Sequence, residues 1–292
     1  MKTRGFSEEF LARLRKVRLY VSGVKAGAHK GTRRSHAFGT SLEFSDYRVY
    51  QPGDDVRQID WNVFGRTGRH YIRRYLDEQE IKAAIYLDCT ASMRTLQGKW
   101  SVARQLASAF SYMILSNDDR LSFFPVAGPP SGIINRKGSV YAKSVLFSIS
   151  QLEMDRTETS FFTELEKSMQ KGRQISIIIT DALESLDHME TVIKKLAGTR
   201  TQSIMLQILG KEELVPLWTG DIKLVDSETS REVNVSMSPR MVSAYQNRLE
   251  KHNSAVEALC MRYGMTYLLA YDTRTVEEII LKDCLLRGIV QR

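Results

Sequence analysis

The chain has 292 residues, of which 42% are hydrophobic and 26% charged, and this composition is typical of a globular protein. Three scattered cysteines exclude a small disulfide-stapled fold and favour a reducing compartment. The formal net charge is +8. No stretch reaches the roughly 18 apolar residues of a membrane-spanning helix, and the first residues lack the apolar region of a signal peptide, so we expect a cytoplasmic protein.

Residues 1–35 predict a basic N-terminal helical arm. Ten Lys and Arg face only two Glu in residues 1–34, which accounts for the whole positive excess of the chain. Hydrophobic side chains recur between the basic ones at near-helical spacing: Phe6, Phe10, Leu14, Val17 and Val21. This pattern fits a surface helix docked by its apolar stripe, or a peripheral contact with an anionic membrane or an acidic partner. No nucleic-acid-binding motif accompanies the charge, so we expect no nucleic-acid partner.

Residues 36–80 predict a β-rich subdomain of short strands and turns. The Pro-Gly pair of "QPGDD" indicates a turn. Carboxylates and arginines lie close together around this turn: Asp54, Asp55, Asp60, Arg48 and Arg57. Close opposite charges attract by roughly 4 kcal/mol at an effective dielectric constant of 20. We therefore interpret these residues as structural ion pairs, with a partner-facing surface and a catalytic acid cluster as alternatives.

Apolar strands alternate with helical patterns from residue 81 onward. "IKAAIYLD" and "QISIIITD" are predicted buried strands that end on a carboxylate, and amphipathic helices follow them. The alternation predicts an α/β fold with a doubly wound, mostly parallel sheet over residues 81–292. The segment from about residue 220 to 236 interrupts this alternation and predicts a β-hairpin insertion.

The two strands that end in carboxylates predict a metal site. They place Asp88 and Asp181 on one edge of the sheet, and Thr90 and Ser92 follow Asp88 at alternate positions. Thr159 adds another hydroxyl from a loop that opens a helix. Carboxylate and hydroxyl oxygens suit Mg²⁺ or Mn²⁺. The alternative is that the hydroxyls after the strand only cap the next helix.

These residues resemble the metal-ion-dependent adhesion site of von Willebrand factor type A domains. The pattern of that family, D-x-S-x-S followed by a Thr and an Asp, is matched in order by Asp88, Thr90, Ser92, Thr159 and Asp181, with Thr90 in place of the usual first Ser. The resemblance implies that the hydroxyls hold Mg²⁺ or Mn²⁺ directly and that the carboxylates act mainly through water. It also implies that a carboxylate from a partner protein completes the coordination shell.

The segment "RVYQPGDDVRQIDW" is similar to the signature of the bacterial domain-of-unknown-function family 58. The matching positions are Arg48, Tyr50, Pro52, Gly53, Asp54, Asp55, Arg57, Ile59, Asp60 and Trp61. In that family the signature comes just before a type A domain. Its genes often neighbour those of MoxR-type AAA+ ATPases, so the resemblance implies such an ATPase, or a client protein, as the partner in assembly, maturation or metal insertion.

Two other functions stay open at this point. The same site could serve a Mg²⁺- or Mn²⁺-dependent hydrolase, for which Glu184 is the nearest candidate base. The domain could also be a metal-free scaffold. No P-loop, H-E-x-x-H or C-x-x-C motif is present, and Cys89 is expected to pack inside the site loop. We therefore expect a metal-dependent protein-binding module that is not an enzyme.

Overall fold

The computed structural model describes most of the chain, in the ranges 6–22, 24–26, 33–38, 44–78, 80–153, 159–216, 220–225 and 232–292. The protein divides into two compact units. Unit 1 comprises Met1–Tyr20 and Ile81–Arg292, and unit 2 comprises Val21–Glu80. The first boundary therefore differs from the predicted one at residue 35, because the N-terminal helix packs into unit 1 and is not a separate arm.

A six-stranded sheet forms the centre of unit 1, in the order β13-β10-β9-β6-β7-β8. Its strands are β6 (Lys82–Asp88), β7 (Arg120–Val126), β8 (Ile134–Lys137), β9 (Ile175–Thr180), β10 (Gln202–Leu209) and β13 (Thr266–Tyr271). Only β8 pairs antiparallel with its neighbour, which confirms the predicted mostly parallel α/β sheet. The chain runs from β6 to β7 on one side and returns to β9 on the other. The topological switch point therefore lies between β6 and β9.

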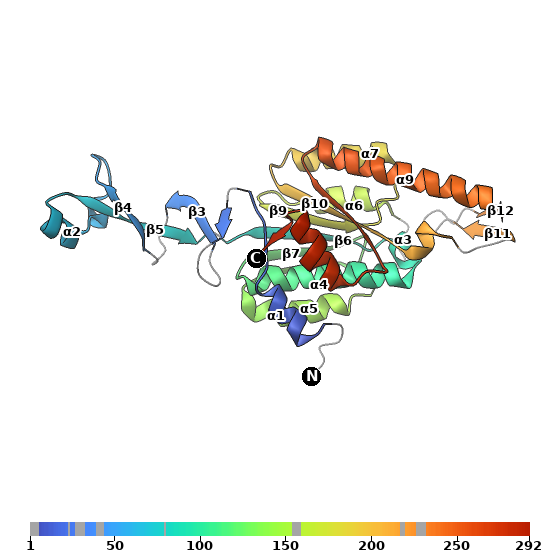
Figure 1. Ribbon diagram of the computed structural model, residues 1–292, viewed down its shortest axis with the longest axis horizontal. Helices are drawn as coiled ribbons and strands as arrows, with labels where there is room; N and C mark the ends of the chain where they lie inside the picture. Colours follow the sequence, from blue (N-terminus) through green and yellow to red (C-terminus); the bar gives the residue numbers. More distant parts are fainter. Residues whose placement is uncertain are drawn as a thin grey trace. The chain divides into compact units, whose positions relative to one another are not determined.

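Helices cover both faces of this sheet (Figure 1). One face carries α4 (Gln97–Ser116), α1 (Glu8–Leu14), α5 (Ala142–Ser150) and α10 (Val276–Glu278), and α10 continues into a π-helix (Ile279–Cys284). The opposite face carries α6 (Phe161–Ser168), α7 (Leu186–Ala197) and α9 (Pro239–Arg262). Shorter segments are α3 (Ala91–Arg94), α8 (Lys211–Leu214) and the 3-10 turns Pro130–Gly132 and Ser139–Tyr141.

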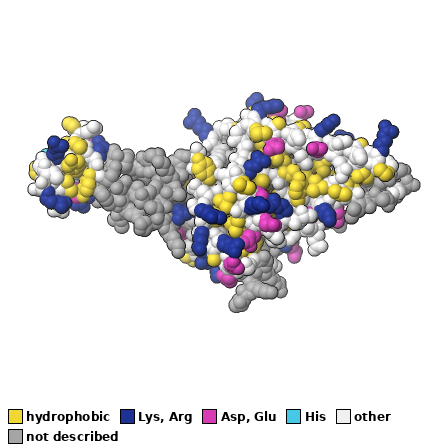
Figure 2. All heavy atoms as spheres, in the orientation of Figure 1, with side chains coloured by type: hydrophobic (Ala, Val, Ile, Leu, Met, Phe, Trp, Pro, Cys, Tyr) yellow, Lys and Arg dark blue, Asp and Glu magenta, His cyan; other side chains and the backbone are white. Residues whose placement is uncertain are grey.

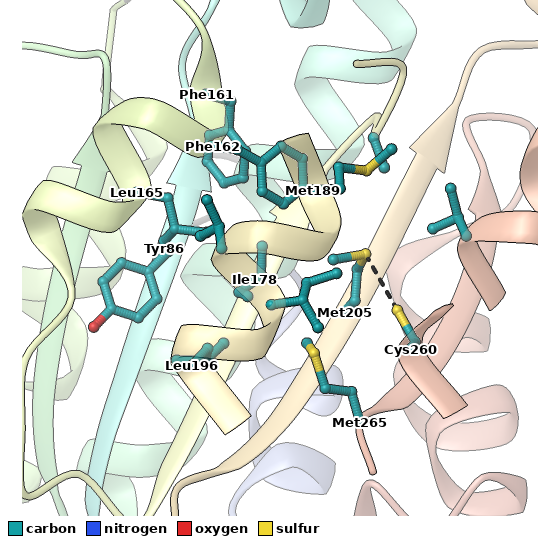
Figure 3. Close-up of a cluster of buried hydrophobic side chains, with 14 of the residues drawn as sticks. Tyr86, Phe161, Phe162, Leu165, Ile178, Met189, Leu196, Met205, Cys260 and Met265 are labelled. Atoms are coloured by element: carbon teal, nitrogen blue, oxygen red, sulfur yellow. Dashed lines mark hydrogen bonds between the residues drawn. The ribbon is translucent and has the colours of Figure 1, made fainter. Parts of the chain in front are cut away.

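Aromatic, aliphatic and sulfur-containing side chains fill the core between the sheet and α6, α7 and α9 (Figure 3). Tyr86 stacks on Phe124 with ring centroids 5.2 Å apart. The thiol of Cys260 donates to Met205 Sδ at 3.7 Å. Fully burying each large apolar side chain contributes about 1.5–3 kcal/mol, so this packing fixes the strands whose ends carry the candidate site. The buried, free thiols of Cys260 and Cys284 belong to the core.

The N-terminal helix docks through its apolar stripe. Ser7 caps α1 by accepting a hydrogen bond from Phe10 N at 3.1 Å. The stripe residues Phe6, Phe10, Leu14, Val17 and Val21 are all 8% exposed or less, which confirms the docking prediction. The helix is shorter than the apolar pattern, because the helix ends at Leu14 and the pattern continues to Val21. The next segment, β1 (Arg18–Leu19), pairs antiparallel with β14 (Val290–Gln291).

Unit 2 contains an antiparallel sheet in the order β2-β3-β5-β4. Its elements are β2 (Val24–Ala26), β3 (Arg33–Phe38), β4 (Phe44–Val49), the 3-10 turn Val56–Gln58, α2 (Trp61–Thr67) and β5 (Tyr71–Glu78). In unit 1, β11 (Gly220–Val225) and β12 (Glu232–Met237) form the predicted hairpin, whose turn lies outside the described residues. None of the helices in the described ranges has the length and apolar character needed to cross a membrane.

Candidate functional site

Asp88 ends β6 at the switch point and is 1% exposed. Its Oδ1 accepts hydrogen bonds from Thr90 N at 2.9 Å and Thr90 Oγ1 at 2.6 Å, and its Oδ2 accepts one from Thr180 Oγ1 at 2.6 Å. Burial, and then the charge of Asp181, raises the pKa of Asp88 to about 7. No Lys, Arg or His side chain in the described ranges pairs with this carboxylate. Within the part of the chain that the structure describes, Asp88 is therefore a buried acid with hydroxyl and amide partners and no cation.

Thr90 and Ser92 face the same point as Asp88. Thr90 occupies the N-cap position of α3, but its hydroxyl makes no capping hydrogen bond. Instead, Thr90 Oγ1 donates to Asp88 and lies 3.1 Å from Ser92 Oγ. The geometry therefore argues against Thr90 as a mere helix cap. The structure brings three of the five predicted ligands into one line of oxygen atoms.

Cys89, between Asp88 and Thr90, packs in the interior, as expected. It is fully buried, and its thiol donates to Leu87 O at 3.6 Å. Burial, and then the charge of Asp88, raises the pKa of the Cys89 thiol well above its ordinary value. Full burial and a raised pKa both disfavour the reactive thiolate form, so Cys89 is best interpreted as a packing residue.

Asp181 follows β9 and is paired with a buried lysine. Lys99 Nζ, on the first turn of α4, lies 3.0 Å from Asp181 Oδ2 and 2.6 Å from Glu213 Oε1. Its side chain is 1% exposed. Burial lowers the pKa of Lys99, but the Asp181 and Glu213 carboxylates outweigh that effect, and its pKa lies above the ordinary value. Lys99 is therefore a fixed positive charge on the second carboxylate of the site.

The donor set fits a hard divalent cation that keeps part of its water shell. Lys99 pairs with Asp181 and Glu213, and Asp88 has no cationic partner in the described ranges, so three carboxylates accompany a single ammonium. Mg²⁺ favours oxygen ligands and commonly retains several waters. Across the described ranges, no group of three or more His, Cys, Asp or Glu side chains could hold a metal by itself. A cation here would therefore depend on the hydroxyls of Thr90 and Ser92 and on water.

Thr159 does not join the other predicted ligands through any contact of the described residues. Thr159 is exposed, and it makes no hydrogen bond with the other described residues. The alternative Thr157 lies outside the described residues. Thr180, whose hydroxyl donates a hydrogen bond to Asp88, was not among the residues predicted from the sequence. The pairing of β6 with β9 sets Leu87 beside Ile179 and so brings Thr180 close to Asp88. In the sequence, the one indication of this contact is that Thr180 directly precedes Asp181.

Glu184, the candidate base of the hydrolase alternative, is occupied by other contacts. Its Oε2 accepts from Ser160 Oγ at 2.7 Å and lies 3.1 Å from His188 Nδ1. Its Oε1 accepts from Phe162 N at 3.3 Å. These contacts tie the loop after β9 to the start of α6. Glu184 therefore has a structural role in positioning α6.

Strained backbone flanks the site. Ala127, after β7, has φ +60°, and Ala182, after β9, has φ +51°. The left-handed region costs an L-residue with a Cβ roughly 1–2 kcal/mol. Ala182 is stabilised there, because its N–H donates to Thr180 Oγ1 at 3.1 Å and its carbonyl lies 2.7 Å from His252 Nε2. Such strain is typical of functional sites.

The signature turn of unit 2 contains one of the predicted ion pairs. Arg48 Nη2 lies 2.6 Å from Asp54 Oδ1. Gly53 has φ +105°, a conformation that favours glycine, and Asp54 N donates to Gln51 O at 3.0 Å to close the turn. The turn therefore forms as the Pro-Gly pair predicts.

The two remaining carboxylates of the signature cap helices. Asp55 accepts from Arg57 N at 3.0 Å and lies 4.0 Å from Arg57 Nε, which is a weak pair. Asp60 pairs with Arg73 at 2.7 Å, and the prediction that it pairs with Arg48 or Arg57 is wrong. The hairpin register sets Tyr47 beside Arg73, and Tyr47 OH also donates to Asp60, at 2.8 Å.

Asp60 is a structural carboxylate with a full set of partners. Its Oδ1 accepts from Asn62 N at 2.9 Å and Val63 N at 3.2 Å, which caps α2. The Arg73 hydrogen bond, which outweighs the effect of burial, holds the pKa of Asp60 well below its usual range. These contacts favour structural ion pairing over catalysis for this part of the signature.

The fold and site define an α/β protein with a carboxylate–hydroxyl cluster at its switch point and a β-rich unit that carries the signature turn. The chain belongs to the family described as "Protein of unknown function DUF58", whose profile matches residues 46–255. Similar proteins include the uncharacterized proteins Mb1516 of Mycobacterium bovis and Rv1480 of Mycobacterium tuberculosis. Each is 23% identical over 248 residues, which cover 82% of this chain and 76% of the relative.

Two solved structures with some likeness to this chain come from Bacteroides species. The conserved hypothetical protein BatB from Bacteroides thetaiotaomicron is 15% identical, with a TM-score of 0.37 over 71% of this chain and 98% of its own. An aerotolerance-related membrane protein from Bacteroides fragilis is also 15% identical, with a TM-score of 0.32 over 63% of this chain and 98% of its own. Likenesses this weak carry no conclusion about fold or function.

Proposed function

We propose that this protein is a metal-dependent protein-binding module of the von Willebrand factor type A kind and not an enzyme. The observation that carries the proposal is Asp88, a buried carboxylate that faces two hydroxyls at the switch point and has no cationic partner in the described ranges. Asp88, Thr90 and Ser92 would hold Mg²⁺ or Mn²⁺. Asp181 adds negative charge nearby, and Thr159 completes the ligand set that the type A resemblance implies.

The residues of the chain have separate roles in this proposal. Thr180 fixes one oxygen of Asp88 and so orients the carboxylate toward the loop. Lys99 neutralises Asp181, which lowers the repulsion between the two acids. A bound cation supplies an open coordination position for a carboxylate. Ser92, the only partly exposed member of the line, stands on the side from which such a carboxylate can approach.

The proposed partner supplies that carboxylate. On the basis of the family resemblance, we propose a cytoplasmic MoxR-type AAA+ ATPase, or a client protein that it acts on. The basic residues of the N-terminal segment provide a second contact, with an anionic membrane surface.

Metal-dependent stabilisation tests the site. We expect Mg²⁺ or Mn²⁺ to raise the free energy of unfolding, by about 2.7 kcal/mol at 100 times Kd, and EDTA to reverse the effect. Asp88→Asn should abolish this gain, whereas the matched Asp187→Asn, at an exposed acid on α7, should keep it. Equal stabilisation of wild type and Asp88→Asn would contradict the proposal.

Partner binding tests the function. We expect pull-down of a MoxR-type ATPase or client to be lost in EDTA and in Asp88→Asn, with no further loss when both are combined. Undiminished capture by Asp88→Asn would rule out the metal-dependent module.

A metal-free scaffold is the second candidate, and the Lys99–Asp181 pair favours it. A buried ammonium already neutralises one of the two acids, and a proton on Asp88 can neutralise the other. In this case neither Mg²⁺ nor Mn²⁺ changes the stability of the protein, and partner binding is insensitive to EDTA.

A further inference from the structure

Unit 2 carries an exposed ring cluster around α2, formed by Tyr50, Trp61, Phe64 and His70. The Phe64 and His70 rings stack with centroids 4.3 Å apart. Trp61 meets Phe64 and His70 edge-on at 6.0 and 6.1 Å, and Tyr50 meets His70 at 6.3 Å. Trp61 is nevertheless 60% exposed. The rings therefore pack on one another and leave a broad aromatic surface in contact with solvent.

The helix that presents this surface has no core of its own. None of the residues of α2 is buried, although it includes Trp61, Val63 and Phe64. It is held at its ends instead, by the Asp60 cap and by Gly68, whose N–H donates to Phe64 O at 2.8 Å. Short helices gain most of their stability from packing an apolar face. The apolar face of α2 thus has the character of one half of an interface.

Exposed arginines lie close in sequence to the residues of the ring cluster. Arg66 and Arg69 are exposed and make no ion pair with the described residues, and the Arg57 side chain is 90% exposed. The nearby acids are largely neutralised, because Asp54 pairs with Arg48 and Asp60 with Arg73. In Figure 2, hydrophobic side chains gather on the described part of unit 2 with Lys and Arg side chains beside them. Trp, Tyr and Arg are the residue types most enriched at protein-binding hot spots.

We propose that the ring cluster and its arginines bind an acidic segment of a partner protein that carries at least one apolar side chain. The apolar side chain packs on Trp61, and the carboxylates of the segment pair with Arg66 and Arg69. This interface shares no residue with the Asp88 site or with the N-terminal segment, so it is a separate binding surface beyond the proposed metal-dependent one.

Charge balance favours a protein over a nucleic acid as the occupant. Residues 44–78 contain six arginines and six Asp or Glu, so the segment offers no net positive field. Nucleic-acid affinity depends on neutralising several phosphates at once, and the half-exposed Asp55 among the arginines opposes that. A peptide with a few carboxylates requires only the local pairs.

Photo-crosslinking of the full chain identifies the occupant. A benzoylphenylalanine at Val63, on α2, is expressed in the native cell, and the cross-linked peptide is sequenced by mass spectrometry. We expect an acidic protein segment. A cross-link to nucleic acid, to a segment without Asp or Glu, or to no molecule overturns the proposal.

Binding of the identified segment, as a labelled synthetic peptide, then measures each contribution by fluorescence anisotropy. We expect Trp61→Ala and Arg66→Glu/Arg69→Glu each to weaken binding about ten-fold or more, and Trp61→Phe to weaken it less. The matched controls Met261→Ala and Arg240→Glu/Arg248→Glu, at exposed positions of α9, should bind like wild type.

Two further comparisons separate this surface from a fold defect and from the metal site. A peptide with Lys in place of its acids should bind Arg66→Glu/Arg69→Glu better than wild type, which an unfolded unit 2 cannot do. Asp88→Asn and EDTA should leave peptide binding unchanged. Unaltered peptide binding by Trp61→Ala overturns the proposal. It is also overturned if the same variants lose binding to a single-stranded oligothymidylate as strongly as they lose binding to the peptide.

Discussion

Lys99 Nζ lies 3.0 Å from Asp181 Oδ2, and the two buried groups join α4 to the loop after β9. The same ammonium also reaches Glu213 on α8. The two strand-terminal acids of unit 1 therefore differ, because Asp181 has an internal cation, whereas Asp88 has hydroxyl and amide donors as its partners among the described residues. Asp88 is therefore the carboxylate of the site that is free to pair with a bound cation.

Lys99→Met should strongly destabilise unit 1, because it leaves two carboxylates without their buried partner. Breaking a buried pair from one side costs about 3–5 kcal/mol, and chemical denaturation measures the loss. The exposed pair Lys195–Glu166 gives the matched control, since Lys195→Met should cost no more than about 1 kcal/mol. If Mg²⁺ restores stability to Lys99→Met more than to wild type, the cation acts near Asp181. Equal losses in the two variants would mean that the Lys99 pair has no special role.

Asp88 should make the metal-free protein less stable as the pH rises. Its pKa increases from 3.8 to about 7 on folding, so the folded state binds the proton more tightly. The contribution of Asp88 to stability is therefore greatest at pH values below 3.8 and is lost as the pH rises toward 7. Urea denaturation in EDTA across this range should show the decline, and Asp88→Asn should lack it. A wild-type profile identical to that of Asp88→Asn would contradict the prediction.

Asp60 should have the opposite pH dependence in unit 2. Arg73, Tyr47 and the α2 amides favour its charged form, and its pKa is lowered on folding. Its contribution is therefore present above the ordinary carboxyl pKa and is lost as the pH falls through the lowered value. Relative to the intrinsic exchange rate at each pH, hydrogen exchange of the Asn62 and Val63 amides should accelerate at low pH and in Asp60→Ala. Asp60→Asn, which can still cap α2, should accelerate exchange less. Equal exchange rates in all three proteins would exclude this role.

Phe10→Ala should destabilise unit 1 as a whole. Phe10 is 4% exposed on α1, and truncating a buried Phe to Ala costs about 3–5 kcal/mol. Thermal denaturation measures the effect. Tyr20→Ala is the matched control at a 43% exposed aromatic and should cost far less. A Phe10→Ala protein as stable as the control would mean that the N-terminal helix does not contribute to the unit 1 core.

Local sequence patterns predict much of this fold and part of the site. Apolar runs that end on Asp88 and Asp181 locate two strand ends, and spacing alone predicts that Thr90 and Ser92 follow the first of them. The apolar stripe of the N-terminal segment likewise predicts a docked surface. These predictions hold because each depends on periodicity within a single element.

Contacts between different strands and helices could not be predicted from the sequence. Thr180 reaches Asp88 through the register of β6 and β9, and Arg73 reaches Asp60 through the register of a hairpin. Lys99 projects from α4 onto two other elements. Each contact depends on which residues become neighbours after the strands pair and the helices pack, and no local pattern encodes that choice.

The pairing of β1 with β14 has a consequence for synthesis on the ribosome. Arg18 and Leu19 are translated before the whole central sheet, whereas their partners Val290 and Gln291 follow it. The β1 segment must therefore remain without its strand partner while the strands and helices of unit 1 between them are made. Unit 1 completes its fold only after translation has passed residue 291.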